Sequence, residues 1–234
     1  MNFDGITTLT FDCYGTLIDW ERGILTALRP LLARSESRPD DLTLRDFADH
    51  EARQQAATPA MLYADLLTEV HGQLARHWGV AADLAEDRRF GASIGDWPAF
   101  PDTVEALRAL KQHFRLVILS NVDRTSFQAT NARLGVTFDA IYTAQDIGSY
   151  KPDTRNFIYL QQRLAEQGVR PEQMLHVAQS LFHDHVPAQA MGLRSVWIDR
   201  RGNATNPGNV HYDARYPGLA AFVQAYQAGA AKIF

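Results

Sequence analysis

A short apolar segment that ends in a single acid constrains this chain more than any other feature. The run from Ile6 to Thr10, followed by Phe11, is rich in β-branched residues and predicts a buried strand. Asp12 comes directly after it, and Gly15 frees the backbone for a tight turn. Ligands of open α/β sheets bind beyond the carboxyl ends of the strands. The sequence therefore predicts that Asp12 lies where chemistry takes place.

Beyond Pro98, short apolar segments alternate with segments of helical periodicity. Such alternation predicts an α/β fold with a parallel, doubly wound sheet. Strands are expected over 115–119, 140–142, 174–178 and 195–198, and helices over 102–114, 126–134, 154–167, 185–191 and 219–228.

Between the first strand and Pro98 the pattern is helical, with few β-branched runs. The second of the expected helices begins with Thr43 as a possible N-cap. The sheet is thus split in sequence by a helical insertion. We predict a core of residues 1–17 and 98–234 and a helical cap of residues 18–97. Helices within the cap are expected over 22–32, 42–57, 60–78 and 82–93.

The composition excludes several classes of protein. The 234 residues carry a formal net charge of −4 and their basic residues are dispersed, so no nucleic-acid footprint is expected. No N-terminal apolar segment has the length of a signal peptide or a membrane span. Cys13 is the only cysteine, which rules out a disulfide or a thiolate metal site within one chain. We expect a cytoplasmic protein with no nucleic-acid or membrane partner.

Polar clusters follow the first strand and three later segments of the expected core. Taken singly they are weak signals, because a Ser-Asn pair after a strand is usually a turn and a Lys-Pro-Asp is usually a helix start. Their common position at one edge of the sheet favours a shared site. The clusters are Asp12 with Tyr14 and Thr16, Ser120 with Asn121, Lys151, and Gln179 and Ser180 with Asp184.

The order Asp-x-Tyr-Gly-Thr, Ser-Asn, Lys-Pro-Asp and a late Asp resembles the haloacid dehalogenase superfamily, most of all its L-2-haloacid dehalogenase (type II) branch. The resemblance covers nearly the whole chain. It implies a Rossmann-like core with a helical cap inserted after the first strand, a small-molecule substrate and a homodimer. It is specific for the superfamily, whereas the motifs do not specify the substrate.

The chemistry of these residues fits that resemblance. Asp12 would attack an electrophilic carbon and form an aspartyl ester, which water then hydrolyses. Lys151 can keep the carboxylate ionised by a charge-assisted hydrogen bond. Thr16 and Ser120 can orient it with hydroxyl donors. Asp184 is the expected group to position or activate the water.

Two positions argue against a phosphatase. Superfamily phosphatases carry an acid two residues after the nucleophile, where this chain has Tyr14, and a metal-binding acid where it has Gln179. Magnesium prefers carboxylate oxygen, and phosphoryl transfer without metal or general acid is poorly supported. We therefore expect no metal and no organic cofactor. Tyr14, Gln179 and Asn121 are expected to contact substrate, with Asn121 donating to a leaving halide or a carboxylate as the resemblance implies.

The cap is harder to interpret. The resemblance implies an arginine that binds the substrate carboxylate, and Arg53 and Arg45 are the candidates, although either fits a solvated surface better. Trp20 either lines the pocket or packs at the cap hinge. A tryptophan face also favours a cationic ligand, which admits a substrate with an ammonium group.

Some positions depart from the branch near the late acid. Leu181 stands where the branch tends to carry Asn, and Phe157 where it tends to carry Tyr. His183 and His185 flank Asp184, and either contact with the site or helix packing explains them equally well. The set of residues that positions water is therefore altered.

We favour metal-independent hydrolytic dehalogenation of short (S)-2-haloalkanoic acids. Three alternatives stay open. The first keeps the aspartyl ester but opens another carbon electrophile, such as a strained cyclic amino acid of the azetidine-2-carboxylate type. The second is a phosphatase, and the third is a non-catalytic binding protein.

Overall fold

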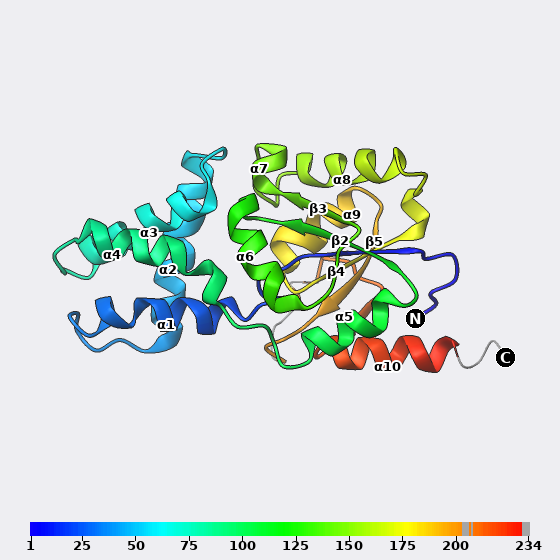
Figure 1. The fold of residues 1–234 in the computed structure, drawn as a ribbon, viewed down its shortest axis with the longest axis horizontal. Coiled ribbons are helices and arrows are strands. Elements are labelled where there is room, and N and C mark those ends of the chain that lie inside the picture. The colour runs from blue at the N-terminus through cyan, green and yellow to red at the C-terminus, as the bar shows by residue number, and fades with distance from the viewer. Residues whose placement is uncertain (203–205, 207, 231–234) are drawn as a thin grey trace.

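A six-stranded parallel sheet forms the core of the computed structural model, which describes residues 1–202, 206 and 208–230 (Figure 1). The strand order is β3-β2-β1-β4-β5-β6, so β1 is an interior strand with β2 and β4 as neighbours. Asp12 follows directly on β1 and thus reaches the middle of the carboxyl edge. The strands are β1 (Thr8–Phe11), β2 (Arg115–Ser120), β3 (Ala140–Thr143), β4 (Met174–Ala178), β5 (Arg194–Ile198) and β6 (Ala214–Tyr216).

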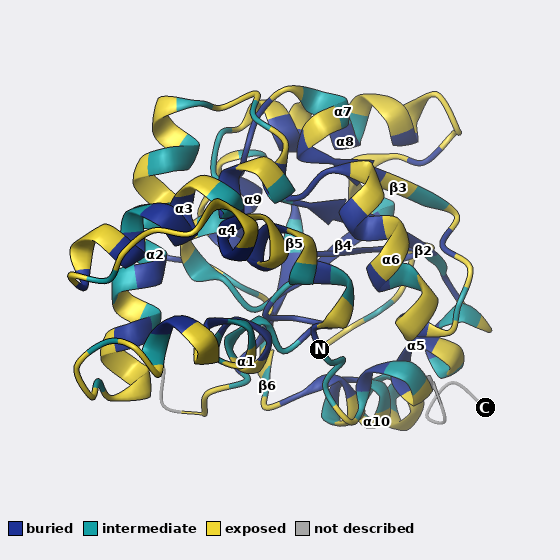
Figure 2. Cartoon of the chain, turned by 60° about the vertical axis from the view of Figure 1, so that its left-hand side comes forward, coloured by how far each residue is buried: buried dark blue, intermediate teal, exposed yellow. Residues whose placement is uncertain are grey.

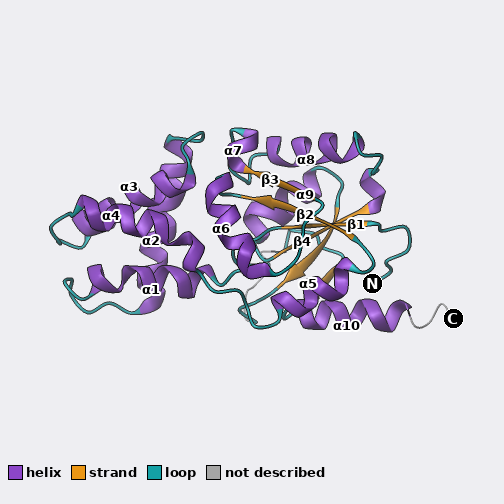
Figure 3. Ribbon diagram, in the orientation of Figure 1, coloured by secondary structure: helices purple, strands orange, loops and turns teal. Residues whose placement is uncertain are grey.

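Helices cover both faces of the sheet, as expected for a doubly wound α/β fold (Figure 3). On one face, Leu9 and Phe11 of β1 belong to the same buried cluster as Leu107 and Phe222. On the other face, strand residues such as Val117 pack with helix residues in a second cluster. The first face carries α5 (Thr103–Lys111), α6 (Arg124–Leu134) and α10 (Leu219–Ala230), and the second carries α8 (Arg155–Ala165) and α9 (Val186–Ala190). The short α7 (Ala144–Ile147) contributes to both clusters.

The chain between β1 and α5 is a helical insertion that lies to one side of the sheet (Figure 1). Buried residues follow the inner faces of its helices, as Figure 2 shows. Its limits at residues 18 and 97 stay predictions. The insertion contains α1 (Trp20–Leu32), α2 (Asp40–Ala57), α3 (Tyr63–His77), α4 (Leu84–Gly91) and a 3-10 turn (Ala92–Asp96).

The structure corrects the expected elements at several points. The short α7 and the edge strand β6 were not predicted, because each has only three or four residues and no long apolar run. Thr43 is not an N-cap, since α2 begins at Asp40 and the Thr43 hydroxyl donates to the carbonyl of Pro39 inside the first turn. The helix expected over 185–191 is preceded by a π-helical turn, Leu181–His185.

None of the helices in the described part of the chain is both long and apolar enough to cross a membrane.

Candidate active site

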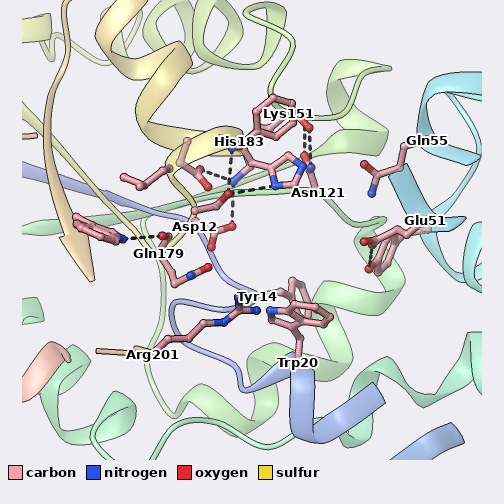
Figure 4. Close-up of a pocket in the computed structure, with 16 residues that line it drawn as sticks. Asp12, Tyr14, Trp20, Glu51, Gln55, Asn121, Lys151, Gln179, His183 and Arg201 are labelled. Carbon is pink, nitrogen blue, oxygen red and sulfur yellow. Dashed lines mark hydrogen bonds and ion pairs between the residues drawn. The ribbon is translucent and has the colours of Figure 1, made fainter. Parts of the chain in front are cut away.

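A pocket of about 380 Å³ opens between the carboxyl edge of the sheet and the helical insertion (Figure 4). Residues from both sides line it, and we name two groups of them. The core wall is formed by Asp12, Asn121, Lys151 and Asp184, and the cap wall by Trp20, Glu51, Gln55 and Tyr63.

The turn after β1 holds Asp12 at the base of the pocket. The carbonyl of Cys13 accepts hydrogen bonds from the backbone of Leu17 at 2.7 Å and Ile18 at 3.0 Å. Gly15 has a φ of +97°, which side chains other than glycine rarely tolerate. A Cβ atom there would lie 3.2 Å from Oε1 of Gln179 and 3.2 Å from Nε1 of Trp20. Glycine at this position therefore permits both the turn and the close approach of its neighbours.

Lys151 links the two acids of the core wall. Its Nζ donates to Oδ1 of Asp12 at 2.9 Å and to Oδ1 of Asp184 at 2.6 Å. The remaining proton goes to the carbonyl of Leu119 at 3.1 Å. The ammonium group is 1% exposed, so these charge-assisted bonds are shielded from water.

The second oxygen of Asp12 is held by Thr16. The Thr16 hydroxyl donates to Oδ2 of Asp12 at 2.6 Å and accepts a hydrogen bond from the backbone N–H of Gln179 at 2.9 Å. Because that oxygen lone pair is occupied by Gln179, the hydroxyl proton is directed at Asp12. The carboxylate is thereby fixed at both oxygens.

His176 is a residue of the site that sequence reasoning missed. It is the register partner of Thr10 across β1 and β4, and the Thr10 hydroxyl bonds its Nδ1 at 2.9 Å. Its Nε2 lies 3.0 Å from Oδ1 of Asp184. The available signal was a single histidine in an otherwise apolar strand, eight residues before Asp184.

Burial and the shared ammonium set the ionisation of this group. Burial alone would raise the pKa of Asp184, but Lys151 and His176 outweigh it and hold that pKa well below the usual range. Burial would lower the pKa of Lys151, but the two carboxylates raise it. Burial raises the pKa of Asp12, against the lowering effect of Lys151. Lys151 therefore stays charged, and of the two acids Asp12 takes up a proton more readily.

Four of the expected substrate-binding residues line the pocket: Tyr14, Trp20, Asn121 and Gln179. Asn121 exchanges two hydrogen bonds with the backbone of Lys151, at 3.0 Å and 2.7 Å, which positions the lysine. The Tyr14 hydroxyl turns away to Thr130 at 2.7 Å, so Tyr14 offers its ring to the pocket.

Two expectations are not met. The Ser120 hydroxyl is buried and forms no hydrogen bond, so it does not orient Asp12. Arg53 is exposed on α2 and is not a pocket residue, and Arg45 is exposed as well. At 3.6 residues per turn, residues 51 and 55 share one face of the helix, and residue 53 lies on the opposite face. Glu51 and Gln55 therefore take the place expected for Arg53.

The donor set does not fit a divalent metal. The Lys151 ammonium already stands between Asp12 and Asp184, where a shared cation would have to bind. The nearby Tyr14 and Gln179 supply no carboxylate, which magnesium prefers. Within the described ranges no group of three or more His, Cys, Asp or Glu side chains is arranged to hold a metal ion.

Comparison with known proteins places this geometry in context. A family model described as haloacid dehalogenase-like hydrolase matches residues 6–181. The (S)-2-haloacid dehalogenase 4A of Burkholderia cepacia is 28% identical over 208 residues, or 86% of each chain. The (S)-2-haloacid dehalogenase of Pseudomonas sp. (strain YL) is 25% identical over 241 residues, or 98% of each. The L-2-haloacid dehalogenase of Xanthobacter autotrophicus with chloropropionic acid covalently bound shares the fold, with a TM-score of 0.78 at 17% identity over 95% of this chain and 98% of that one.

Proposed function

This chain belongs to the haloacid dehalogenase-like hydrolases, and from that premise we propose that it hydrolyses the carbon–halogen bond of short (S)-2-haloalkanoic acids. One observation carries the proposal: the Asp12 carboxylate is fixed at the base of a pocket by Lys151 and Thr16. The family match and the names of the two relatives support it.

The first chemical step is a displacement at carbon. An oxygen of Asp12 attacks C2 of the substrate from the side opposite the halogen, the new C–O bond forms, and the halide leaves with the bonding electron pair. Lys151 balances the charge of the carboxylate before attack, and Thr16 limits its rotation. The configuration at C2 inverts in this step.

The second step releases the product. Water attacks the ester carbonyl of Asp12, the bond between that carbonyl carbon and the substrate oxygen breaks, and the hydroxy acid leaves with inverted configuration. We infer that Asp184 activates this water, which is supported by the hold of Lys151 and His176 on its Oδ1 and by the lack of a hydrogen-bond partner for its buried Oδ2. The net reaction converts halo acid and water into hydroxy acid, halide and a proton.

Halide release from (S)-2-chloropropionate in the presence of EDTA tests the proposal. We expect release that survives EDTA, yields (R)-lactate and disappears in Asp12→Asn, while Asp49→Asn on the exposed side of α2 releases halide normally. A single turnover in ¹⁸O-water should place the label on Asp12, because water attacks the carboxyl carbon. Label in the lactate but not in Asp12 would contradict the ester.

The phosphatase alternative is weaker because Tyr14 and Gln179 stand where phosphoryl transfer would need a general acid and a metal-binding acid. Phosphate release from p-nitrophenyl phosphate that requires magnesium would revive it. A folded protein without turnover of any substrate class would favour the non-catalytic alternative.

We also propose a cytoplasmic location and a homodimer. The lone cysteine, which is buried, suits a reducing compartment. The dimer rests on the family resemblance alone. Cell fractionation and sedimentation equilibrium test these two proposals.

A further inference from the structure

The cap wall contains a carboxyl group for which the proposed reaction has no use. Glu51 lies on α2 one helical turn before Gln55, and both side chains face the pocket (Figure 4). Tyr63, the first residue of α3, donates its hydroxyl to Oε1 of Glu51 at 2.5 Å. No cation is among the groups that act on Glu51 in the described chain. The Tyr63 hydroxyl bonds one of the two carboxylate oxygens, so the other can accept a hydrogen bond from a ligand.

The ionised form of Glu51 would be stabilised by any positive group that enters the pocket. Burial raises the pKa of Glu51 to about 7, against the lowering effect of the Tyr63 hydrogen bond. Burial also raises the pKa of Tyr150, which Glu51 influences, so the Tyr150 hydroxyl stays neutral. A cation beside Glu51 would offset the loss of hydration that its ionised form suffers.

The cations around the pocket are already engaged. Lys151 directs its three protons to Asp12, Leu119 and Asp184. Arg201, the other cation that lines the described pocket, is paired with Glu21. The cap wall thus has no positive side chain that could pair with an anionic group of the ligand. It has one carboxylate, Glu51, that could pair with a cationic group.

Aromatic rings complete the environment of a cation. Tyr14, Trp20 and Tyr63 line the same pocket. The faces of such rings attract ammonium groups, by about 0.5–2 kcal/mol depending on exposure. Glu51 and these rings together are suited to bind a protonated amine.

We propose that Glu51 binds an ammonium group of the substrate, so that the enzyme prefers carbon electrophiles that also carry a protonated amine. The inference rests on the proposed function, because Asp12 attacks the carbon while Glu51 holds the amine across the pocket. Gln55, on the same face of α2, is placed to accept a second N–H.

A pair of substrates with the same reacting carbon and leaving group tests the inference. We expect kcat/KM for 3-amino-2-chloropropionate to exceed that for 2-chloropropionate at least tenfold. Glu51→Gln, which retains an acceptor for Tyr63, should lower the ratio of kcat/KM for the amino substrate to that for 2-chloropropionate about tenfold. Asp49→Asn removes the same charge from the exposed face of α2 and should leave this ratio unchanged.

The products of the two chloro acids are hydroxy acids, and their binding can be measured without turnover. Such a measurement separates this inference from the proposed function. We expect calorimetry to show 3-amino-2-hydroxypropionate binding at least tenfold more tightly than lactate, with the preference lost in Glu51→Gln. If neither chloro acid releases halide but this preference is found, the proposed reaction fails and the amine site stands. The inference would be overturned if lactate and 3-amino-2-hydroxypropionate bind equally well or if 3-amino-2-hydroxypropionate does not bind. A preference that survives Glu51→Gln would also overturn it.

Discussion

The core wall and the cap wall of the pocket differ in how their polar groups are satisfied. On the core wall, both oxygens of Asp12 and every proton of the Lys151 ammonium have protein partners. On the cap wall, Glu51 has the Tyr63 hydroxyl and no cation. The core wall holds its nucleophile ready and leaves Oδ2 of Asp184 for the attacking water, whereas the cap wall leaves an interaction for the ligand to complete. In the two proposals above, the reaction and the choice of substrate are therefore encoded in different parts of the chain.

Removal of the Lys151 ammonium group should cause the largest loss of activity among the variants of the core wall. In Lys151→Met, Asp12 and Asp184 lose the charge that they share, and the two carboxyl groups can no longer both stay ionised at low energy. We expect kcat/KM for halide release to fall about a thousandfold, which corresponds to about 4 kcal/mol of transition-state stabilisation. The measurement is steady-state halide release, with circular dichroism to verify folding.

Lys111→Met is the matched control, since Lys111 pairs with Asp139 far from the pocket. It should leave kcat/KM within twofold of the unaltered protein. Activity in Lys151→Met within tenfold of the unaltered protein would show that Lys151 is not needed to hold Asp12 ready.

The histidine beneath the core wall should make stability depend on pH. Burial lowers the pKa of His185 to about 4, although the carbonyl of Ala178 accepts a hydrogen bond from it and Asp184 lies nearby. His176 and Lys151 add to the lowering. The unfolded chain takes up this proton near pH 6.5, so the stabilisation is complete above that pH and is lost as the pH falls toward 4.

The expected loss between pH 7 and pH 4 is about 3 kcal/mol. Denaturant unfolding of the native chain and of His185→Gln at several pH values measures it, because contributions from other groups cancel in the comparison. His185→Gln should show a shallower pH dependence by this amount. Parallel curves for the two proteins would mean that His185 is protonated as easily in the folded state as in the unfolded one.

His176 should affect the second chemical step rather than the first. In His176→Leu, Asp184 loses one of two donors to Oδ1, so its carboxylate is less well oriented toward water. We expect kcat to fall about tenfold, or about 1.4 kcal/mol, with a burst of one halide per enzyme as the ester accumulates. Rapid-quench measurement of halide detects the burst.

His211→Asn, an exposed position, serves as the control and should show neither effect. If His176 serves only to fill the space below the sheet, its replacement should lower stability and leave the ratio of burst to steady-state rate unchanged.

The core wall could be predicted from sequence and the cap wall could not, for a physical reason. Asp12, Thr16, Lys151 and Asp184 follow strands or turns at one edge of a parallel sheet, and the fold class alone brings such positions together. The rotation of α2 depends on tertiary packing, because only Thr43 and Phe47 along its length are buried. No strong apolar stripe therefore indicates which face meets the pocket.

The same reasoning explains the individual errors. Residue type alone favours Arg53 as the partner of a carboxylate, whereas its neighbours Glu51 and Gln55 line the pocket. His176 was overlooked because a histidine within an apolar strand carries no motif, and its partner Thr10 is 166 residues away in sequence.

Gly15 lies where the two walls meet, and its replacement gives the smallest effect of the series. Gly15→Ala and Gly79→Ala both place a Cβ at positive φ, +97° and +68°. At Gly79 nothing lies within 4 Å, whereas at Gly15 the Cβ meets Gln179 from the core and Trp20 from the cap, each at 3.2 Å. The two variants therefore share a backbone penalty of about 1 kcal/mol, and only Gly15→Ala adds crowding at the pocket. We expect both to lower the free energy of unfolding and only Gly15→Ala to raise KM, by about threefold. An equal KM in the two variants would mean that the contact between the Gly15 turn and Trp20 does not fix the position of the cap wall over Asp12.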